Sequence, residues 1–357
     1  MVFSELKFFE GKRVFITGHT GFKGTWLTQI MVQSGAIVCG YSLPVINDES
    51  HFNGLNLKDE ITHIEGDICD EANLTEAMRS FKPDIVFHLA AQALVKLAYS
   101  DPVMTFSTNV MGSLNILQAV KNCASVRSMV YITSDKCYEN VEWEWGYREV
   151  DPLGGHDPYS ASKAAAEILF SSYTRSFYHE RSNFGAASVR AGNVIGGGDY
   201  SLDRIVPDCI RAIRQNNPIE LRNPQSTRPW QHVLEPLSGY ILLAQKLFED
   251  PKKYSHPWNF GPGSEVPRSV GYVAQKIVDV YGQGSVSLGI VPSDFHEANL
   301  LQLNCDLANH KLGWKPRWGV EKTLITTANW YCLVDSGTSM EKVTNAQIND
   351  YFGESND

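Results

Sequence analysis

The sequence predicts an α/β fold, a doubly wound parallel sheet followed by a smaller domain of mixed structure. Short apolar segments alternate with longer helical segments over the first 190 residues, which is the pattern of parallel strands joined by crossover helices. A glycine-rich turn follows the first apolar segment, and after about residue 190 glycine, proline and asparagine interrupt the alternation. We therefore expect one domain over residues 1–190, to which some later segments return, and a second mainly over residues 191–357.

The elements of the first domain are predicted in chain order. Strands are expected at the apolar runs 13–18, 36–42, 84–89 and 128–133, and helices over residues 25–34, 109–122 and 158–181. Right-handed crossovers then place the C-terminal end of every strand at one edge of the sheet, where ligands bind. The tail from Asp335 onward is polar, and no element is predicted there.

Composition and charge limit the class of protein. The chain has 357 residues, 43% of them hydrophobic, and a formal net charge of −9, which argues against a nucleic-acid partner because such proteins carry a basic face. No apolar run reaches the roughly 18 residues that a membrane span needs. Residues 1–10 mix charged and apolar side chains, unlike a secretory signal. We expect a cytoplasmic protein with no membrane partner.

Cysteine and histidine patterns predict neither disulfides nor a metal site. The seven cysteines are odd in number and none lie at Cys-x-x-Cys spacing, so reduced thiols are expected. The ten histidines form no His-Glu-x-x-His pattern.

The glycine-rich turn joins the first predicted strand to the first predicted helix. Its glycines recur at Gly-x-x-Gly-x-x-Gly spacing, which lets the backbone approach a pyrophosphate at the N-terminus of the helix. A plain turn is the alternative, but the strand–turn–helix context favours a Rossmann-type dinucleotide site. The residues expected to bind the cofactor there are Gly18, His19, Thr20, Gly21, Phe22, Lys23 and Gly24.

The end of the second strand is unusual for such a site. It reads Gly40-Tyr41-Ser42-Leu43, with neither the acid that usually holds the ribose of NAD nor an arginine for the phosphate of NADP. NAD is the expected cofactor, although this segment does not decide the choice. Asp67 and Ile68 are expected beside the adenine, with a simple strand-end turn as the alternative. Lys23 faces either a phosphate or solvent, and the sequence leaves this open.

A second set of polar residues predicts a hydride-transfer site. Tyr159 and Lys163 are four residues apart and share one face of a predicted helix. Lys163 is expected to hydrogen-bond the cofactor ribose and to lower the pKa of Tyr159 from its usual value of about 10. Ser134, at the end of the preceding strand, is expected to help Tyr159 hold the reacting hydroxyl of a substrate.

Asp135 and Lys136 follow Ser134 directly. Charged residues just past a strand are usually solvated, but this strand end lies at the predicted ligand-binding edge. We therefore expect Asp135 to act as an acid and Lys136 as a potential base. An enzyme that only transfers a hydride needs neither, whereas one that oxidises a sugar and then removes water from it needs both.

These residues resemble the extended short-chain dehydrogenase/reductase superfamily, and within it the nucleotide-sugar 4,6-dehydratases. The resemblance extends from Lys12 to about Tyr331. Besides the glycine turn and the Tyr159 and Lys163 pair, it includes residues 88–92 (His-Leu-Ala-Ala-Gln), 109–112 (Asn-Val-Met-Gly), 190–193 (Arg-Ala-Gly-Asn) and 312–316 (Leu-Gly-Trp-Lys-Pro). The more common dehydratases carry Thr-Asp-Glu where this chain has Ser-Asp-Lys. That difference, together with residues 143–149 and 296–298, resembles the branch that acts on CDP-glucose.

The resemblance implies an NAD-dependent conversion of CDP-glucose to CDP-4-keto-6-deoxyglucose and water, as in bacterial deoxysugar and surface polysaccharide biosynthesis. It implies that Tyr159 takes the proton of the 4-hydroxyl and that Asp135 protonates the departing 6-hydroxyl. Lys136 stands at the position of the usual glutamate base, and is either a neutral base or a fixed positive charge that stabilises the enolate.

The resemblance also implies further contacts. It assigns Leu89, Ala90 and Ala91 to the cofactor, and Asn193, Arg204, Arg228 and His296 to the substrate. In the family two helices of each subunit pair with those of a second subunit. Residues 102–123 and 158–181 therefore imply a homodimer or a dimer of dimers.

Two other functions use part of the same residues. A nucleotide-sugar 4-epimerase needs Ser134, Tyr159 and Lys163 but no acid after the serine. A non-catalytic dinucleotide sensor keeps the glycine turn but typically loses the tyrosine. The acid at Asp135 argues against the 4-epimerase, and the intact Tyr159 argues against the non-catalytic sensor.

Overall fold

A computed structural model describes residues 4–45, 49–263, 268–290 and 300–353. Its centre is a seven-stranded sheet in the order β11-β6-β5-β4-β1-β2-β3, in which every pair of neighbours is parallel. From β1 the chain first builds one half of the sheet and then the other, which is the predicted doubly wound arrangement. The strands are β1 (Arg13–Thr17), β2 (Ile37–Ser42), β3 (Thr62–Glu65), β4 (Ile85–His88), β5 (Ser128–Ile132), β6 (Gly185–Arg190) and β11 (Trp258–Asn259).

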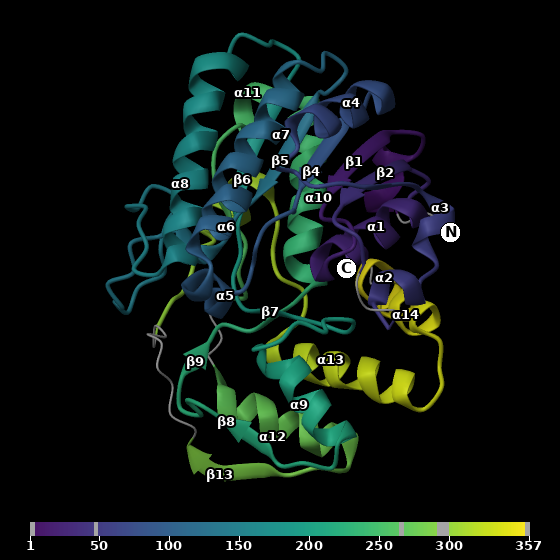
Figure 1. The fold of residues 1–357 in the computed structure, drawn as a ribbon, viewed down its shortest axis with the longest axis vertical. Coiled ribbons are helices and arrows are strands. Elements are labelled where there is room, and N and C mark those ends of the chain that lie inside the picture. Colours follow the sequence, from purple (N-terminus) through teal and green to yellow (C-terminus); the bar gives the residue numbers. More distant parts are fainter. Residues whose placement is uncertain (1–3, 46–48, 264–267, 291–299, 354–357) are drawn as a thin grey trace.

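Helices cover both faces of this sheet (Figure 1). The helices along it are α1 (Phe22–Gln33), α4 (Glu71–Phe81), α7 (Gly112–Lys121), α8 (Pro158–Tyr173) and α10 (Leu234–Glu249). Val14 and Ile16 of β1 enter the core shared with α1 and α10, whereas Phe15 enters the core shared with α4, α7 and α8. Both faces of the strand are therefore buried, which explains why its sequence is apolar throughout.

A second group of elements lies beyond the carboxyl ends of the strands, below the sheet in Figure 1. It comprises three two-stranded pairs, β7 (Val194–Ile195) with β10 (Gln231–His232), β8 (Ile219–Leu221) with β13 (Val286–Ile290) and β9 (Thr227–Arg228) with β12 (Arg268–Ser269), and the helices α9 (Ile205–Arg214), α12 (Val270–Tyr281) and α13 (Val320–Asp335). Two later segments, α10 and β11, return to the main sheet. The domain boundary near residue 190 stays a prediction.

Short elements complete the described chain. They are η1 (Ser4–Phe9), α2 (His51–Gly54), α3 (Leu57–Glu60), α5 (Val95–Ser100), α6 (Pro102–Phe106), η2 (Ser107–Met111), η3 (Asp135–Cys137), η4 (Thr174–Tyr178), α11 (Pro251–Tyr254) and η5 (Ala308–Leu312). Within the described ranges, no helix has both the length and the apolar character to cross a bilayer. All seven cysteines are free thiols.

Two sequence expectations need correction. The first helix begins at Phe22, directly after the turn, and not at residue 25. The polar tail forms a helix, α14 (Met340–Gly353), that buries Val343, Ile348 and Tyr351. Its apolar residues are few, and packing against the rest of the protein stabilises it rather than any strong pattern of its own.

Candidate active site

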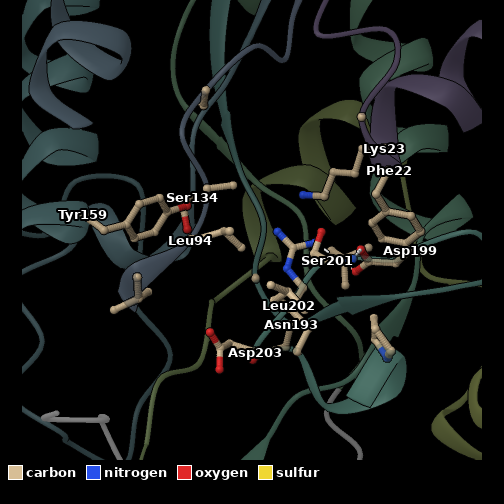
Figure 2. A pocket seen from close by; sticks show the side chains of 18 of the residues that line it. Phe22, Lys23, Leu94, Ser134, Tyr159, Asn193, Asp199, Ser201, Leu202 and Asp203 are labelled. Atoms are coloured by element: carbon tan, nitrogen blue, oxygen red, sulfur yellow. Dashed lines mark hydrogen bonds and ion pairs between the residues drawn. The ribbon is translucent and has the colours of Figure 1, made fainter. Parts of the chain in front are cut away.

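A cavity of about 800 Å³ lies where the carboxyl ends of the main sheet meet the second group of elements. The glycine turn lines one part of it, and Ser134 and Tyr159 line another. Figure 2 shows the Tyr159 and Ser134 side chains pointing toward each other, with Phe22 and Lys23 across the cavity. The predicted cofactor and catalytic residues therefore meet in one space.

The glycine turn forms a tight cradle at the N-terminus of α1. Gly18 has a φ of 71°, and a Cβ there would lie 2.7 Å from the backbone nitrogen of Ala90. A Cβ on Gly24 would lie 2.0 Å from the carbonyl oxygen of Gly18. Only glycine fits at these two positions, so the helix terminus stays open to a phosphate group. The cradle therefore fits a dinucleotide.

Most residues predicted to contact the cofactor line this cavity. They are Gly18, Thr20, Gly21, Phe22, Lys23, Gly24, Asp67, Ile68, Leu89, Ala90, Ala91, Tyr159 and Lys163. At the end of β2, where an acid is usual, the hydroxyl groups of Thr20 and Ser42 lie 2.6 Å apart. The hydroxyls of Thr20 and Ser42, together with Asp67, therefore lie where the adenosine ribose of the cofactor is expected.

His19 is the exception among these residues. Its ring is fully buried beneath the turn, with Nε2 2.7 Å from Nδ1 of His63. A Cβ on Gly40 would lie 2.3 Å from this ring, so the ring requires the glycine in β2. Burial and the neighbouring His63 lower the pKa of His19 to about 3. The side chain of His19 is thus a packing group that is not among the residues lining the cavity, and the cofactor contact predicted for this position stays a prediction.

Lys23 lines the cavity, and its contact with a phosphate there stays a prediction. Burial and, to a smaller extent, the positive charge of Arg204 together lower its pKa to about 8, while Asp135 opposes the shift. Lys23 therefore belongs to the same electrostatic cluster as the acid at the end of β5.

Tyr159 and Lys163, the predicted catalytic pair, come from the first two turns of α8. Asp157 caps this helix, accepting a hydrogen bond of 3.0 Å from the Ser160 backbone N–H. The Nζ atom of Lys163 lies 5.9 Å from the centre of the Tyr159 ring. Burial raises the pKa of Tyr159 to about 12, against the effect of a hydrogen bond with Ser134. Burial also lowers the pKa of Lys163 to about 8.

The expected lowering of the Tyr159 pKa by Lys163 is therefore absent in the protein alone. Removing a phenolate from water costs more than the nearby charges return, because both groups lie inside the protein. Burial therefore favours the protonated form of Tyr159 at neutral pH.

Ser134, Asp135 and Lys136 lie on the turn that follows β5. The Ser134 hydroxyl donates to Oδ1 of Asp135 at 3.0 Å and accepts the Lys136 backbone N–H at 3.3 Å. Asp135 is buried, and Lys136 is half-buried. A Cβ on Gly192 would lie 1.7 Å from Oδ2 of Asp135, so this glycine makes room for the carboxyl group. All three side chains border the cavity, as the sequence predicted.

A buried ion pair between Arg190 and Glu167 contacts the residue that precedes this turn. This pair was not predicted from the sequence. Arg190 binds Glu167 through two hydrogen bonds of 2.9 Å. Glu167 also accepts hydrogen bonds from the hydroxyls of Thr133 and Ser188. Glu167 lies one helical turn after Lys163, and this spacing was the only local signal that pointed to it.

The predicted substrate residues are placed as follows. Asn193, Arg204 and Arg228 line the cavity, and Asn193 has a φ of 52°. Arg204 pairs with Asp199 at 2.9 Å, and the Tyr331 hydroxyl donates to the Asp199 carbonyl at 2.7 Å. His296 lies outside the described residues.

The lining of the cavity contains an ion pair that the sequence did not predict. Lys96, in α5, binds Asp203, just before α9, and both residues line the cavity. Within the described part of the chain, no group of three or more His, Cys, Asp or Glu side chains could hold a metal ion.

Comparison with known proteins places the chain in a family. The model of the GDP-mannose 4,6 dehydratase family matches residues 15–327. The chain belongs to this family. A CDP-glucose 4,6-dehydratase from Salmonella typhimurium is 47% identical over 97% of this chain and 97% of its own. A UDP-glucose 4-epimerase from Mycolicibacterium smegmatis is 24% identical over 89% of this chain and 98% of its own.

Solved structures share the fold at lower sequence identity. A UDP-glucose 4-epimerase from Thermotoga maritima, solved with UDP-glucose, has a TM-score of 0.77 and 20% identity, covering 89% of this chain and 98% of its own. A dTDP-glucose 4,6-dehydratase from Bacillus anthracis, solved with NAD, has a TM-score of 0.76 and 19% identity, covering 92% of this chain and 98% of its own. The predicted Rossmann-type α/β fold is confirmed.

Proposed function

We propose that this protein is an NAD-dependent lyase that converts CDP-glucose to CDP-4-keto-6-deoxyglucose and water. The observation that carries the proposal is the meeting of Ser134, Asp135, Lys136, Tyr159 and Lys163 in one cavity beside the glycine cradle. The identity of 47% with a CDP-glucose 4,6-dehydratase over nearly the whole chain supports the same reaction and the same nucleotide.

Residues of the cradle and of the β2 and β4 ends would hold NAD. When bound, this cofactor supplies the chemistry of accepting a hydride from carbon 4 and returning it to carbon 6. The cradle, the hydroxyls of Thr20 and Ser42, and Asp67 offer backbone and side-chain partners for it.

The side chains of the site divide into two sets. In the oxidation step Tyr159 takes the proton of the 4-hydroxyl, and Ser134 holds the same oxygen by a hydrogen bond. Lys163 adds positive charge beside the tyrosine. The resulting ketone makes the hydrogen on carbon 5 acidic.

The elimination step then uses the residues that follow Ser134. The carbon 5 proton leaves as the carbon 6–oxygen bond breaks, and Asp135 gives its proton to the departing hydroxyl, which leaves as water. Lys136 serves at carbon 5, either by accepting the proton or by stabilising the enolate oxygen as a fixed charge. A nucleotide-sugar 4-epimerase needs no acid at this place, so Asp135 favours the dehydratase.

Arg204, Arg228 and Asn193 are proposed to bind the diphosphate of the substrate, and His296 stays a predicted contact. Cationic and amide donors suit phosphate oxygens. The three described residues line the same cavity as the proposed catalytic residues.

The test of the proposed function is incubation with CDP-glucose and NAD, followed by product analysis. We expect a 4-keto-6-deoxy sugar, which absorbs in alkali, and no product with Tyr159→Phe. Formation of CDP-galactose instead would show an epimerase. Equal turnover of dTDP-glucose and CDP-glucose would overturn the choice of nucleotide.

We also propose a homodimer or a dimer of dimers, built on α6, η2 and α8. Three apolar side chains there are strongly exposed, Val103 at 75%, Ile168 at 60% and Met111 at 52%. Large exposed apolar side chains on adjacent helices are typical of a subunit interface. Ile168→Glu is expected to lower the molecular mass measured by light scattering, whereas Val150→Glu, at a site elsewhere that is 84% exposed, is not.

The substrate and the free thiols suit a cytoplasmic enzyme of deoxysugar synthesis for surface polysaccharides.

A further inference from the structure

The cavity continues past the catalytic residues to a second end, formed by α9 and β8. The first turn of α9 and the whole of β8 line it, and the two elements pack against each other. The glycine cradle lies at the opposite end. On the proposed function, the glucosyl group lies beside Tyr159 and the diphosphate beside Arg204, so the nucleoside must occupy the α9–β8 end.

Two opposite charges line this α9–β8 end, Asp208 of α9 and Arg222, directly after β8. Burial raises the pKa of Asp208, whereas the positive charges of Arg211 and Arg222 lower it. Asp208 is in the first turn of α9 and Arg222 directly follows β8, so the two charges come from elements that pack against each other at this end of the cavity.

A second arginine holds Asp208 in place. Arg211, one turn later in α9, donates to Oδ1 of Asp208. Arg211 is fixed in turn by the carbonyl oxygens of Tyr200 at 3.2 Å and Ser201 at 3.1 Å. The Asp208 carboxylate is therefore oriented before any ligand binds.

A carboxylate only accepts hydrogen bonds, and a guanidinium only donates them. Cytosine presents a matching edge, because its N4 amine donates whereas N3 and O2 accept. Uracil and thymine present O4 in place of the amine, which would set one acceptor against another. A site built on such polar partners rejects the wrong ligand because its own groups are left unpaired.

We propose that Asp208 accepts the N4 amine of cytosine and that Arg222 donates to its N3 and O2 edge, so that this pair selects cytidine over uridine and thymidine nucleotides. The proposal deepens the proposed function, since it names the groups that choose the nucleotide of the same substrate.

Asp279 provides a matched control. It lies in α12, which packs against α9, but it is exposed and is not among the residues that line the cavity. Its side chain and charge are those of Asp208, and its carboxylate accepts a hydrogen bond from Gln275.

The experiment measures binding of CDP and UDP by calorimetry, and kcat/KM for CDP-glucose, UDP-glucose and dTDP-glucose, in the wild type, Asp208→Asn and Asp279→Asn. An amide both donates and accepts, so Asp208→Asn is expected to reduce the preference for CDP over UDP by about tenfold or more. Asp279→Asn is expected to keep the wild-type preference. Wild-type circular dichroism and an unchanged thermal midpoint will show that the variants fold.

An unchanged preference in Asp208→Asn, with a selective wild type, would overturn the proposal. Equal loss of selectivity in both variants would also overturn it, since a general charge effect would then be responsible. Selective CDP binding that depends on Asp208, without formation of a keto sugar, would support this proposal and refute the proposed reaction. The experiment therefore distinguishes a failure of nucleotide selection by Asp208 from a failure of the proposed dehydratase reaction.

Discussion

Glu167 and Arg190 form a two-pronged ion pair, with both hydrogen bonds at 2.9 Å and each side chain 2% exposed. The pair connects α8, which carries Lys163, to β6. Through Thr133 it also holds the strand end that carries Ser134. The oxidation residues are thus fixed relative to one another by a charge pair that does not line the cavity.

Removal of one partner of this pair should be costly. In Glu167→Ala the buried Arg190 loses its counter-charge, and we expect the free energy of unfolding to fall by about 3–5 kcal/mol. Urea denaturation of the purified protein measures this. The double variant Glu167→Leu with Arg190→Met should recover much of the loss, because no unpaired charge remains. A loss below about 1 kcal/mol in Glu167→Ala would contradict the role given to the pair.

Gly192→Ala should separate elimination from oxidation. A Cβ there would lie 1.7 Å from Oδ2 of Asp135, so this carboxyl group must move. We expect the 4-keto sugar that retains its 6-hydroxyl to accumulate in single-turnover experiments, with water loss slowed about 100-fold, as for loss of a general acid. The control is Gly263→Ala, where the nearest atom would be 3.9 Å away. Equal slowing of both steps would argue against a specific effect on Asp135.

Lys136→Arg and Lys136→Met distinguish the two roles of Lys136. Arginine keeps a permanent charge but does not act as a base near neutral pH. A fixed-charge role therefore predicts near-normal elimination in Lys136→Arg and a large loss in Lys136→Met. A base role predicts loss in both, with slowed exchange of the carbon 5 hydrogen for solvent deuterium. Normal elimination in Lys136→Met would exclude both roles.

Stability of the protein alone should rise between pH 8 and pH 10. Burial lowers the pKa of Lys163 from 10.5 to about 8, so over this interval the unfolded chain binds more protons than the folded chain. The free energy of unfolding then increases with pH, by about 2 kcal/mol from this residue. Denaturation at a series of pH values, compared with Lys163→Met, isolates the contribution. A flat difference between the two proteins would show that Lys163 is not buried as a charge.

The parts of this protein that the sequence predicted well are those that depend on neighbours along the chain. The glycine turn and the spacing of Tyr159 and Lys163 are local, and the structure places both at the cavity. The buried contact of the His19 side chain was not predicted, because its partner, His63, comes from β3, 44 residues away. The ion pair of Lys96 with Asp203 links residues 107 positions apart. Such contacts follow from tertiary packing and leave no local pattern.

The pKa of Tyr159 shows the same limit for chemistry. Spacing placed a lysine beside the tyrosine, which predicts a lowered pKa. The degree of burial, which decides the sign, is a property of the folded protein, and it raises the pKa to about 12.

The fate of the hydrogen on carbon 4 tests the central claim most directly. CDP-glucose deuterated at carbon 4 is incubated with the enzyme and NAD, and the product is examined by NMR and mass spectrometry. Oxidation and elimination in one cavity predict a 4-keto-6-deoxy product that carries the deuterium on carbon 6. Deuterium that remains on carbon 4 of an epimerised sugar would contradict the account.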